Sequence, residues 1–122
     1  MIADRDIEAG NKLEEELTRY AHAKQAIFLF TNPHRVKFIE CDTTSWDDQV
    51  RLFEVAASFS PTGKISFVIA NAGIHRKDEV FAYAGDDNTL EKPDLATIDI
   101  NLIGTLYTSK LASYYFIKQN GQ

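Results

Sequence analysis

A short phrase, Asn71-Ala72-Gly73, directly follows an apolar run and is a place where residue types suggest ligand-binding chemistry. The run, residues 65–70, contains valine and isoleucine and comes after the turn residues Pro61, Thr62 and Gly63, which predicts a buried β-strand. Small side chains and a glycine at the carboxyl end of such a strand let a ligand approach the backbone, and open α/β sheets bind their ligands at that end. The phrase alone is a weak signal, because strands followed by small-residue turns are common.

Three further segments support this interpretation. They are residues 1–6 (MIADRD), 40–43 (ECDT) and 99–104 (DINLIG). Taken with Asn71-Ala72-Gly73, their order and spacing resemble those of the classical short-chain dehydrogenases/reductases. Near the end of the chain, residues 118–121 (KQNG) are similar to the NAD-dependent 15-hydroxyprostaglandin dehydrogenase branch of that family.

The resemblance covers most of the 122 residues and implies an α/β fold. We expect one incomplete NAD(P)-binding Rossmann domain over residues 1–122. It would be a partial doubly wound parallel sheet with strands two to four and their helices, lacking the first strand and the C-terminal part.

The resemblance also implies a preference for NAD over NADP. Asp4, at the end of the second strand, would accept hydrogen bonds from the adenosine ribose hydroxyls. A carboxylate there repels a 2′-phosphate. Arg5 lies in the same turn and could face a phosphate; the alternative, a solvated surface arginine, is favoured.

Further cofactor contacts are implied at the two other strand ends. Asp42 would meet the adenine amino group with Thr43 beside it, although Asp42 could instead be a turn residue leading into a helix. Asn71 would steady the central strand and lie against the cofactor. Ala72 and Gly73 would line the ribose side of NAD.

Asn101 is the one catalytic residue that the resemblance implies. In the family this asparagine kinks its helix and holds a water that relays protons to the active-site lysine. Asparagine is unfavourable inside helices, and Asn101 interrupts an apolar stripe. Such a local inconsistency is typical of a functional position.

Other groups of the family are missing from this sequence. None of the six glycines lie close enough together to form the glycine-rich turn that binds pyrophosphate at a helix start. The catalytic serine and the Tyr-x-x-x-Lys pair are expected beyond the Asn101 helix. Two Tyr-x-x-x-Lys strings occur, at Tyr20 and Tyr114, and both are rejected because one precedes the Asn71 strand and the other shares the Asn101 helix. We expect no catalysis by this chain alone, since the tyrosine is the general acid/base.

Composition is that of an ordinary globular domain, with 44% hydrophobic and 25% charged residues. No run approaches the roughly 18 apolar residues of a membrane span, and the N-terminus is unlike a signal peptide. The single cysteine, Cys41, suits a reducing compartment. A net charge of −5 argues against nucleic acid. The scattered histidines predict no metal site. We therefore expect a cytoplasmic protein without membrane or nucleic-acid partners.

Strand–helix alternation would position these residues. The expected elements are a strand end at residues 1–3, a helix at 6–20, a strand at 36–41, a helix after Ser45, a strand at 65–70, and a helix that begins at Asp94 and ends at Gln119 before Gly121.

Hydrophobic spacing predicts which faces of the helices are buried. The first helix has one apolar face formed by Ile7, Leu13, Leu17 and Tyr20. In the second helix, Ser45 is the expected N-cap, with Asp48 completing a variant capping box. Its buried side is expected to carry Val50, Phe53 and Ala57. The last helix has Leu95, Ile98, Leu102, Leu106 and Tyr107 at helical spacing.

Two stretches have no clear place in this scheme. Residues 26–30 (AIFLF), closed by a turn that ends at His34, predict either an extra hairpin strand or an insertion; the insertion is favoured, because an exposed apolar edge would promote aggregation. The polar residues 75–93 predict a loop long enough to contact a substrate or partner.

The missing first strand has a physical consequence. In the doubly wound order 3-2-1-4-5-6, the first strand lies between the second and the fourth. Either strand four pairs directly with strand two, or the core keeps exposed backbone groups and apolar walls. We therefore expect a marginally stable or partly molten monomer.

Three functions remain open. The first is an NAD-dependent alcohol dehydrogenase or carbonyl reductase acting on a small-molecule substrate. The second is a non-catalytic partner that joins a homo- or hetero-oligomer, binding a full-length relative through the Asp94 to Gln119 helix. The third is a truncated product with no separate role.

Overall fold

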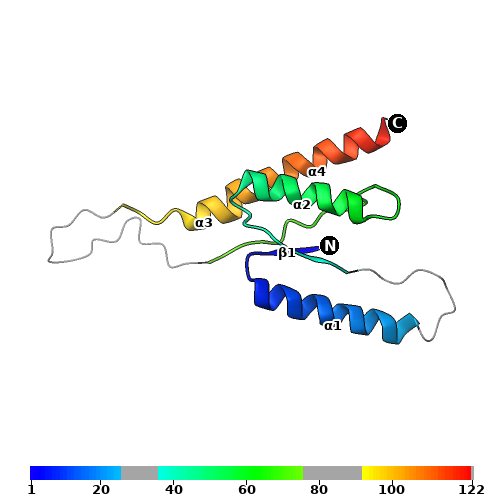
Figure 1. The fold of residues 1–122 in the computed structure, drawn as a ribbon. Coiled ribbons are helices and arrows are strands. Elements are labelled where there is room, and N and C mark those ends of the chain that lie inside the picture. The colour runs from blue at the N-terminus through cyan, green and yellow to red at the C-terminus, as the bar shows by residue number, and fades with distance from the viewer. Residues whose placement is uncertain (26–35, 76–91, 122) are drawn as a thin grey trace.

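The computed structural model describes residues 1–25, 36–75 and 92–121 (Figure 1). The predictions for residues 26–34 and for most of the 75–93 loop lie outside the described residues. In chain order the elements are β1 (Ile2–Asp4), α1 (Ile7–Gln25), β2 (Phe38–Glu40), α2 (Trp46–Phe59), α3 (Ala96–Ile98), η2 (Asp99–Gly104) and α4 (Thr105–Asn120).

A parallel pair of short strands is the centre of the fold. β1 pairs with β2 in a register that places Ile2 opposite Phe38 and Asp4 opposite Glu40. Helix α1 lies on one side of these strands, and α2 with α4 lies on the other (Figure 1). Helices on both sides of a parallel sheet confirm the expected α/β class and a partial Rossmann-type arrangement.

Helix α1 begins because Asp6 caps it: the Asp6 Oδ1 atom accepts a hydrogen bond of 2.9 Å from the backbone N–H of Ala9. The helix approaches β2 closely at Gly10, where a Cβ atom would lie 2.1 Å from the Phe38 ring. It continues to Gln25, beyond the expected end at residue 20.

The predicted apolar face of α1 is not buried. All four of its residues, Ile7, Leu13, Leu17 and Tyr20, are exposed. The physical reason is the width of the sheet, since among the described elements α1 packs mainly against the two short strands. Two three-residue strands offer too little surface to cover a helix of 19 residues.

Helix α2 follows the sequence prediction in its N-cap and in the burial of Phe53, and departs from it at Asp48. The Ser45 Oγ atom accepts a hydrogen bond from the Asp48 N–H at 3.2 Å, which confirms Ser45 as N-cap. The Asp48 carboxylate departs from a capping box, because its Oδ2 atom accepts from the N–H of Asp42 at 3.0 Å. Phe53 is only 3% exposed and forms the core with Leu111 and Ala112 of α4.

The prediction that residues 65–70 form a strand and that this strand is buried is wrong on both points. The segment is extended but forms no strand, and most of its side chains are exposed. Only Ile65 and Val68 pack against the core. A strand requires a neighbour that completes its backbone hydrogen bonds, and β1 and β2 pair only with each other.

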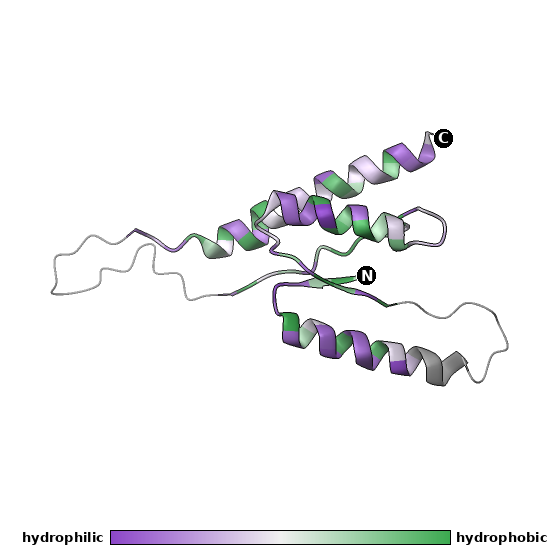
Figure 2. Cartoon of the chain, in the orientation of Figure 1, coloured by the Kyte–Doolittle hydropathy of each residue, from purple (hydrophilic) through white to green (hydrophobic). Residues whose placement is uncertain are grey.

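The last helix confirms its predicted extent to within one or two residues at each end, as three consecutive elements, α3, η2 and α4. Gly121 is its C-cap. Its predicted stripe is largely on the surface: the four exposed members are Leu95, Ile98, Leu102 and Leu106. Figure 2 shows hydrophobic residues along this part of the helix and along residues 65–74.

Candidate functional site

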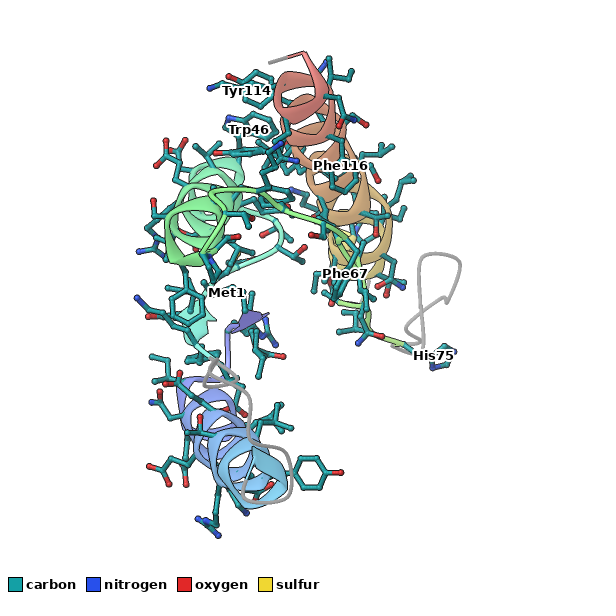
Figure 3. All side chains as sticks on the ribbon, turned by 90° about the vertical axis from the view of Figure 1, so that its right-hand side faces the viewer. Met1, Trp46, Phe67, His75, Tyr114 and Phe116 are labelled. Carbon is teal, nitrogen blue, oxygen red and sulfur yellow. The ribbon has the colours of Figure 1, made fainter. Side chains whose placement is uncertain are left out.

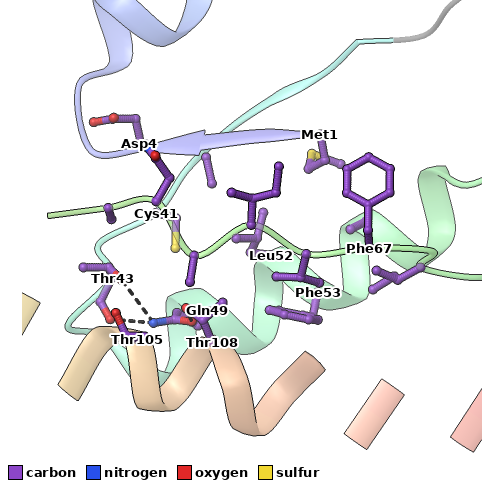
Figure 4. Close-up of a pocket in the computed structure, with 18 of the residues that line it drawn as sticks. Met1, Asp4, Cys41, Thr43, Gln49, Leu52, Phe53, Phe67, Thr105 and Thr108 are labelled. Atoms are coloured by element: carbon purple, nitrogen blue, oxygen red, sulfur yellow. Dashed lines mark hydrogen bonds between the residues drawn. The ribbon is translucent and has the colours of Figure 1, made fainter. Parts of the chain in front are cut away.

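A pocket of about 920 Å³ lies between two walls of different construction (Figure 4). One side is lined by β1 and by residues 41–43, which follow β2, and the other by residues 65–74. We call β1 with its paired strand β2 the sheet wall, residues 65–74 the extended wall, and the pocket the slot. Side chains of α2, among them Leu52 and Phe53, also line the slot.

The slot brings together every residue predicted to contact the cofactor. Its lining includes Asp4, Arg5, Asp42, Thr43, Asn71, Ala72 and Gly73. Asp4 is the last residue of β1, and Asp42 comes two residues after β2 ends. The carboxyl ends of parallel strands are where open α/β sheets bind ligands.

Both aspartates present carboxylate oxygens that backbone groups hold in place. Asp4 Oδ1 accepts from the N–H of Asp6 at 3.0 Å. Asp42 Oδ1 accepts from the N–H and the hydroxyl of Thr44, each at 2.8 Å. The bond from the Thr44 N–H, followed by that from its hydroxyl, lowers the pKa of the Asp42 carboxyl below its usual value. Asp42 is therefore an ionised acceptor suited to N–H or O–H donors of a ligand.

Asn101 lies in a π-helical turn and reaches the extended wall. Its Oδ1 atom accepts from the Ile74 N–H and its Nδ2 atom donates to the Ile74 carbonyl, both at 2.8 Å. The π turn spans Asp99–Gly104, which fits the expected irregularity of the helix at Asn101, and π turns are frequent at functional sites. Asn101 thus holds the end of the Asn71-Ala72-Gly73 phrase; its proton-relay role stays a prediction.

The sequence profile of the family described as short chain dehydrogenase matches residues 4–122. The chain belongs to this family. The match extends over nearly the whole chain, so the sequence motifs and the α/β fold agree on one ancestry.

Relatives at 32–39% identity support the same assignment. A short-chain dehydrogenase/reductase of Acremonium egyptiacum is 39% identical over 66% of this chain and 27% of its own length. The 5′-hydroxyaverantin dehydrogenase of Dothistroma septosporum is 32% identical over 94% of this chain and 36% of its own length. An NADP-dependent dehydrogenase of a Phoma species is 33% identical over 66% of this chain and 24% of its own length. The chain thus spans about a quarter to a third of these relatives. No solved structure matches it significantly.

Gln49 is a site residue that the sequence prediction missed. It is 2% exposed and joins the Asp42 loop to the Asn101 helix. Its Nε2 atom donates to the carbonyls of Thr43, at 2.6 Å, and Gly104, at 3.0 Å. Its Oε1 atom accepts from the Thr108 hydroxyl at 2.7 Å. The available signal was its spacing, four residues before the buried Phe53 on the same helix face.

Gly104 permits this close approach. A Cβ atom at this position would lie 2.6 Å from the Thr43 Oγ1 atom and 3.0 Å from the Thr43 carbonyl oxygen. The helix therefore contacts the loop of Asp42 and Thr43 through bare backbone, and a larger residue at Gly104 would push Thr43 toward the slot.

Cys41, the residue after β2, lines the slot. Burial raises the pKa of its thiol to about 11, and the Asp48 carboxylate adds to the rise. Because the thiolate is the nucleophilic form, Cys41 is an inert packing residue at neutral pH.

The two rejected Tyr-x-x-x-Lys strings do not contribute tyrosine to the slot. Tyr114 lies on α4 and contacts Lys118 of the same helix, with 3.5 Å between Lys118 Nζ and the hydroxyl oxygen (Figure 3). Among the described residues, no group of His, Cys, Asp and Glu is arranged to hold a metal ion. None of the helices in the described ranges is long and apolar enough to cross a membrane.

Proposed function

We propose that this chain supplies the adenosine-binding side of an NAD-dependent oxidoreductase that interconverts an alcohol and a carbonyl compound in the cytoplasm. The observation that carries the proposal is the convergence of all seven predicted cofactor residues on one pocket at the carboxyl ends of parallel strands. Membership of the short chain dehydrogenase family supports the type of reaction. The resemblance to the 15-hydroxyprostaglandin dehydrogenase branch suggests the substrate class.

The residues of the slot fit one half of the proposed cofactor. Asp4 and Asp42 offer carboxylate acceptors for ribose hydroxyls and an adenine amino group. Among the described residues that line the slot, the one glycine is Gly73 of the extended wall. This lining therefore has no glycine-rich helix start that could bind a pyrophosphate. We therefore propose weak adenosine-end binding and no turnover by the isolated chain.

Bound NAD would supply a hydride acceptor; the residues of this chain would hold and orient it. Asp4 would take the ribose hydroxyls, and Asp42 the adenine edge. Asn101 would act as the catalytic residue of this chain by holding a water in the proton relay. Its bonds to Ile74 fix the backbone that directly follows Gly73.

Titration of NAD and NADP into the purified chain, followed by amide NMR shifts, tests this proposal. We expect NAD to bind in the millimolar range, about −4 kcal/mol, and more tightly than NADP. Asp4→Asn should bring the two affinities together, because the neutral amide no longer repels a 2′-phosphate. Asp47→Asn, an exposed aspartate of α2 outside the slot, is the matched control and should change neither affinity.

NADP binding at least as tight as NAD would overturn the cofactor preference. Two relatives are named as NADP-dependent dehydrogenases, so a preference for NADP is a real alternative. Formation of NADH from NAD and an alcohol by the isolated chain, followed by absorbance, would contradict the proposed lack of turnover.

A second candidate function rests on the exposed stripe of the last helix. The exposed members are Leu95, the N-cap of α3, and Ile98, Leu102 and Leu106 of α3, η2 and α4. Exposed apolar stripes are typical of protein interfaces. We propose that this helix joins the chain to a copy of itself or to a full-length relative. Sedimentation at increasing concentration should show association that Leu102→Lys abolishes and Leu13→Lys, an exposed leucine of α1, leaves intact. A monomer at all concentrations, with no binding to a full-length relative, would overturn it.

A further inference from the structure

We propose that Gln49 is a positioning residue for nucleotide binding, because its buried carboxamide fixes the loop that presents the Asp42 carboxylate to the slot. The inference rests on the proposed adenosine site and adds to it a residue whose two N–H groups are both used inside the protein. Gln49 acts through a single peptide group, the one between Thr43 and Thr44.

The Gln49 carboxamide has one favourable orientation. Its Nε2 atom donates to the Thr43 carbonyl at 2.6 Å (Figure 4) and to the Gly104 carbonyl at 3.0 Å. On its other side, the Oε1 atom accepts from the Thr108 hydroxyl at 2.7 Å. Turning the group over would set its oxygen against two carbonyl oxygens, so its donor and acceptor ends are not interchangeable. The side chain is 2% exposed, and solvent therefore has almost no access to these bonds.

The peptide group that Gln49 holds also holds the Asp42 carboxylate. The Thr43 carbonyl and the Thr44 N–H belong to one planar unit. The carbonyl accepts from Gln49 Nε2, and the N–H donates to Asp42 Oδ1 at 2.8 Å. Because the unit is rigid, fixing the carbonyl also fixes the direction of the N–H and the place of the carboxylate oxygen. A donor on the carbonyl further polarises the unit and strengthens the bond from its N–H.

The ionisation of Asp42 depends on the same peptide group. The bond from the Thr44 N–H is the main cause that lowers the pKa of the Asp42 carboxyl, ahead of the bond from the Thr44 hydroxyl. The nearby Arg5 lowers this pKa further, and partial burial opposes it. The Asp48 carboxylate of α2 accepts from the Asp42 N–H. Gln49 thus supports, through one peptide group, the ionised acceptor that the proposed adenine contact requires.

The anchor of the loop lies in the last helix. Gly104 and Thr108, which hold the Gln49 carboxamide, end η2 and belong to α4, and Gly104 lies 55 residues from Gln49 in the sequence. On α2, Phe53 comes four residues after Gln49 and is 3% exposed in the core. A site residue is held precisely when its supporting side chain is itself locked by packing and hydrogen bonds. Gln49 has both kinds of support.

The test compares Gln49→Met with the unmutated chain, since methionine has a similar volume but donates no hydrogen bond. Two quantities are measured by NMR at pH 7: the Thr44 amide proton resonance without nucleotide, and the affinity for adenosine monophosphate (AMP). The Thr44 resonance should move upfield as its bond to Asp42 weakens, and AMP affinity should fall about five- to tenfold. A residue that only stabilised the fold would change the free energy of unfolding and leave both quantities of the folded chain unchanged.

Gln119 provides the matched control. Its carboxamide also joins two segments, 54 residues apart in the sequence, through bonds of 2.6 and 3.1 Å to the backbone of Ile65. Gln119→Met should therefore move the Ile65 amide resonance. It should leave the Thr44 resonance in place and AMP affinity within about twofold.

Two variants of Thr108 give the same answer if Gln49→Met does not fold. Thr108→Val keeps the branched shape but removes the hydroxyl that holds Gln49 Oε1. It should move the Thr44 resonance in the same direction and weaken AMP binding about two- to fourfold. Thr108→Ser retains the hydroxyl and should restore both quantities.

Three results would overturn the inference while leaving the nucleotide site intact. The first is unchanged AMP affinity in Gln49→Met, whether or not the Thr44 resonance moves. The second is a loss of affinity with the Thr44 resonance in place, because Gln49 would then not act through this peptide group. The third is an equal effect of Thr108→Val and Thr108→Ser, which would make packing decisive. Absence of saturable AMP binding by the unmutated chain would instead contradict the proposed function, and this inference with it.

Discussion

In the two walls of the slot, β-strands form where the sequence favours them less and are absent where it favours them more. The sheet wall has strands of only three residues, IAD and FIE, and is joined by backbone hydrogen bonds. The extended wall is richer in isoleucine, valine and phenylalanine, yet forms no strand. Only the carboxamides of Gln119 and Asn101 hold its ends.

This difference separates two requirements of a strand. Residue type favours extended backbone, but a strand exists only where a neighbour completes its hydrogen bonds. The extended wall meets the first requirement and the sheet wall meets the second. The walls also rest on different supports, because Ile65 and Val68 pack against the Phe53 core, whereas β1 and β2 contact α1.

The largest expected effect comes from removing the support of the extended wall. Phe53→Ala should lower the free energy of unfolding by about 3–5 kcal/mol, since Phe53 is 3% exposed and its loss leaves a cavity under that wall. Urea denaturation followed by circular dichroism measures the change. Phe67→Ala is the matched control, at a phenylalanine that is 75% exposed, and should stay within about 0.5 kcal/mol.

A loss below about 1 kcal/mol for Phe53→Ala would mean that the core is loosely packed. The same experiment also tests the expectation from the sequence that the monomer is marginally stable or partly molten. A sharp near-ultraviolet dichroism signal and a cooperative transition in the unmutated chain would contradict that expectation.

A different substitution should destabilise the sheet wall. Gly10→Ala puts a Cβ atom 2.1 Å from the Phe38 ring, and the resulting displacement of α1 from β2 should exceed the gain in helix propensity. We expect a net loss of about 1–2 kcal/mol, with faster hydrogen exchange in β2 and little change at Ile65 and Val68.

The control for Gly10→Ala is Gly121→Ala. There a Cβ atom would meet only the Ile117 carbonyl oxygen, at 3.7 Å, so stability should hardly change. Equal loss of protection in both walls of the Gly10→Ala variant would show that the walls unfold as one unit and would contradict separate supports.

The sequence predicted which residues share one pocket better than it predicted burial. Asp4, Asp42 and Asn71 lie at or just beyond the ends of local segments, so motif spacing was sufficient to place them in one pocket. The N-cap at Ser45 and the C-cap at Gly121 are equally local features.

Burial depends on partners that are distant in sequence, and here prediction failed. The apolar residues 65–70 gave no sign that a neighbouring strand would be lacking at their edge. Leu13 and Leu17 showed the period of a buried helix face, but the sheet is too narrow to cover it. Gln49 resembled a surface glutamine, because its partners Gly104 and Thr108 are more than 50 residues away.

A smaller effect should follow from releasing one clamp of the extended wall. Gln119→Leu removes both hydrogen bonds to Ile65 and should cost about 1–2 kcal/mol, because two half-buried backbone groups lose their partners. Hydrogen exchange at Ile65 should accelerate, while that of β1 stays constant. Asn120→Leu changes the neighbouring exposed residue and should leave the Ile65 amide protected; acceleration in both variants would indicate fraying of α4 instead.

The smallest effect concerns Cys41, which is buried directly after β2 and lines the slot. With a pKa of about 11 against an ordinary value near 9, the thiolate fraction at pH 9 is on the order of 1% in the folded chain and half in the unfolded chain. Alkylation by iodoacetamide at pH 9 should therefore be tens of times slower before than after denaturation in urea. The folded state binds the extra proton, so this contribution to stability is complete below pH 9 and falls as the pH rises from 9 to about 11. Cys41→Ser should remove that pH dependence. Equal reaction rates for native Cys41 and the denatured thiol would contradict a buried thiol of raised pKa.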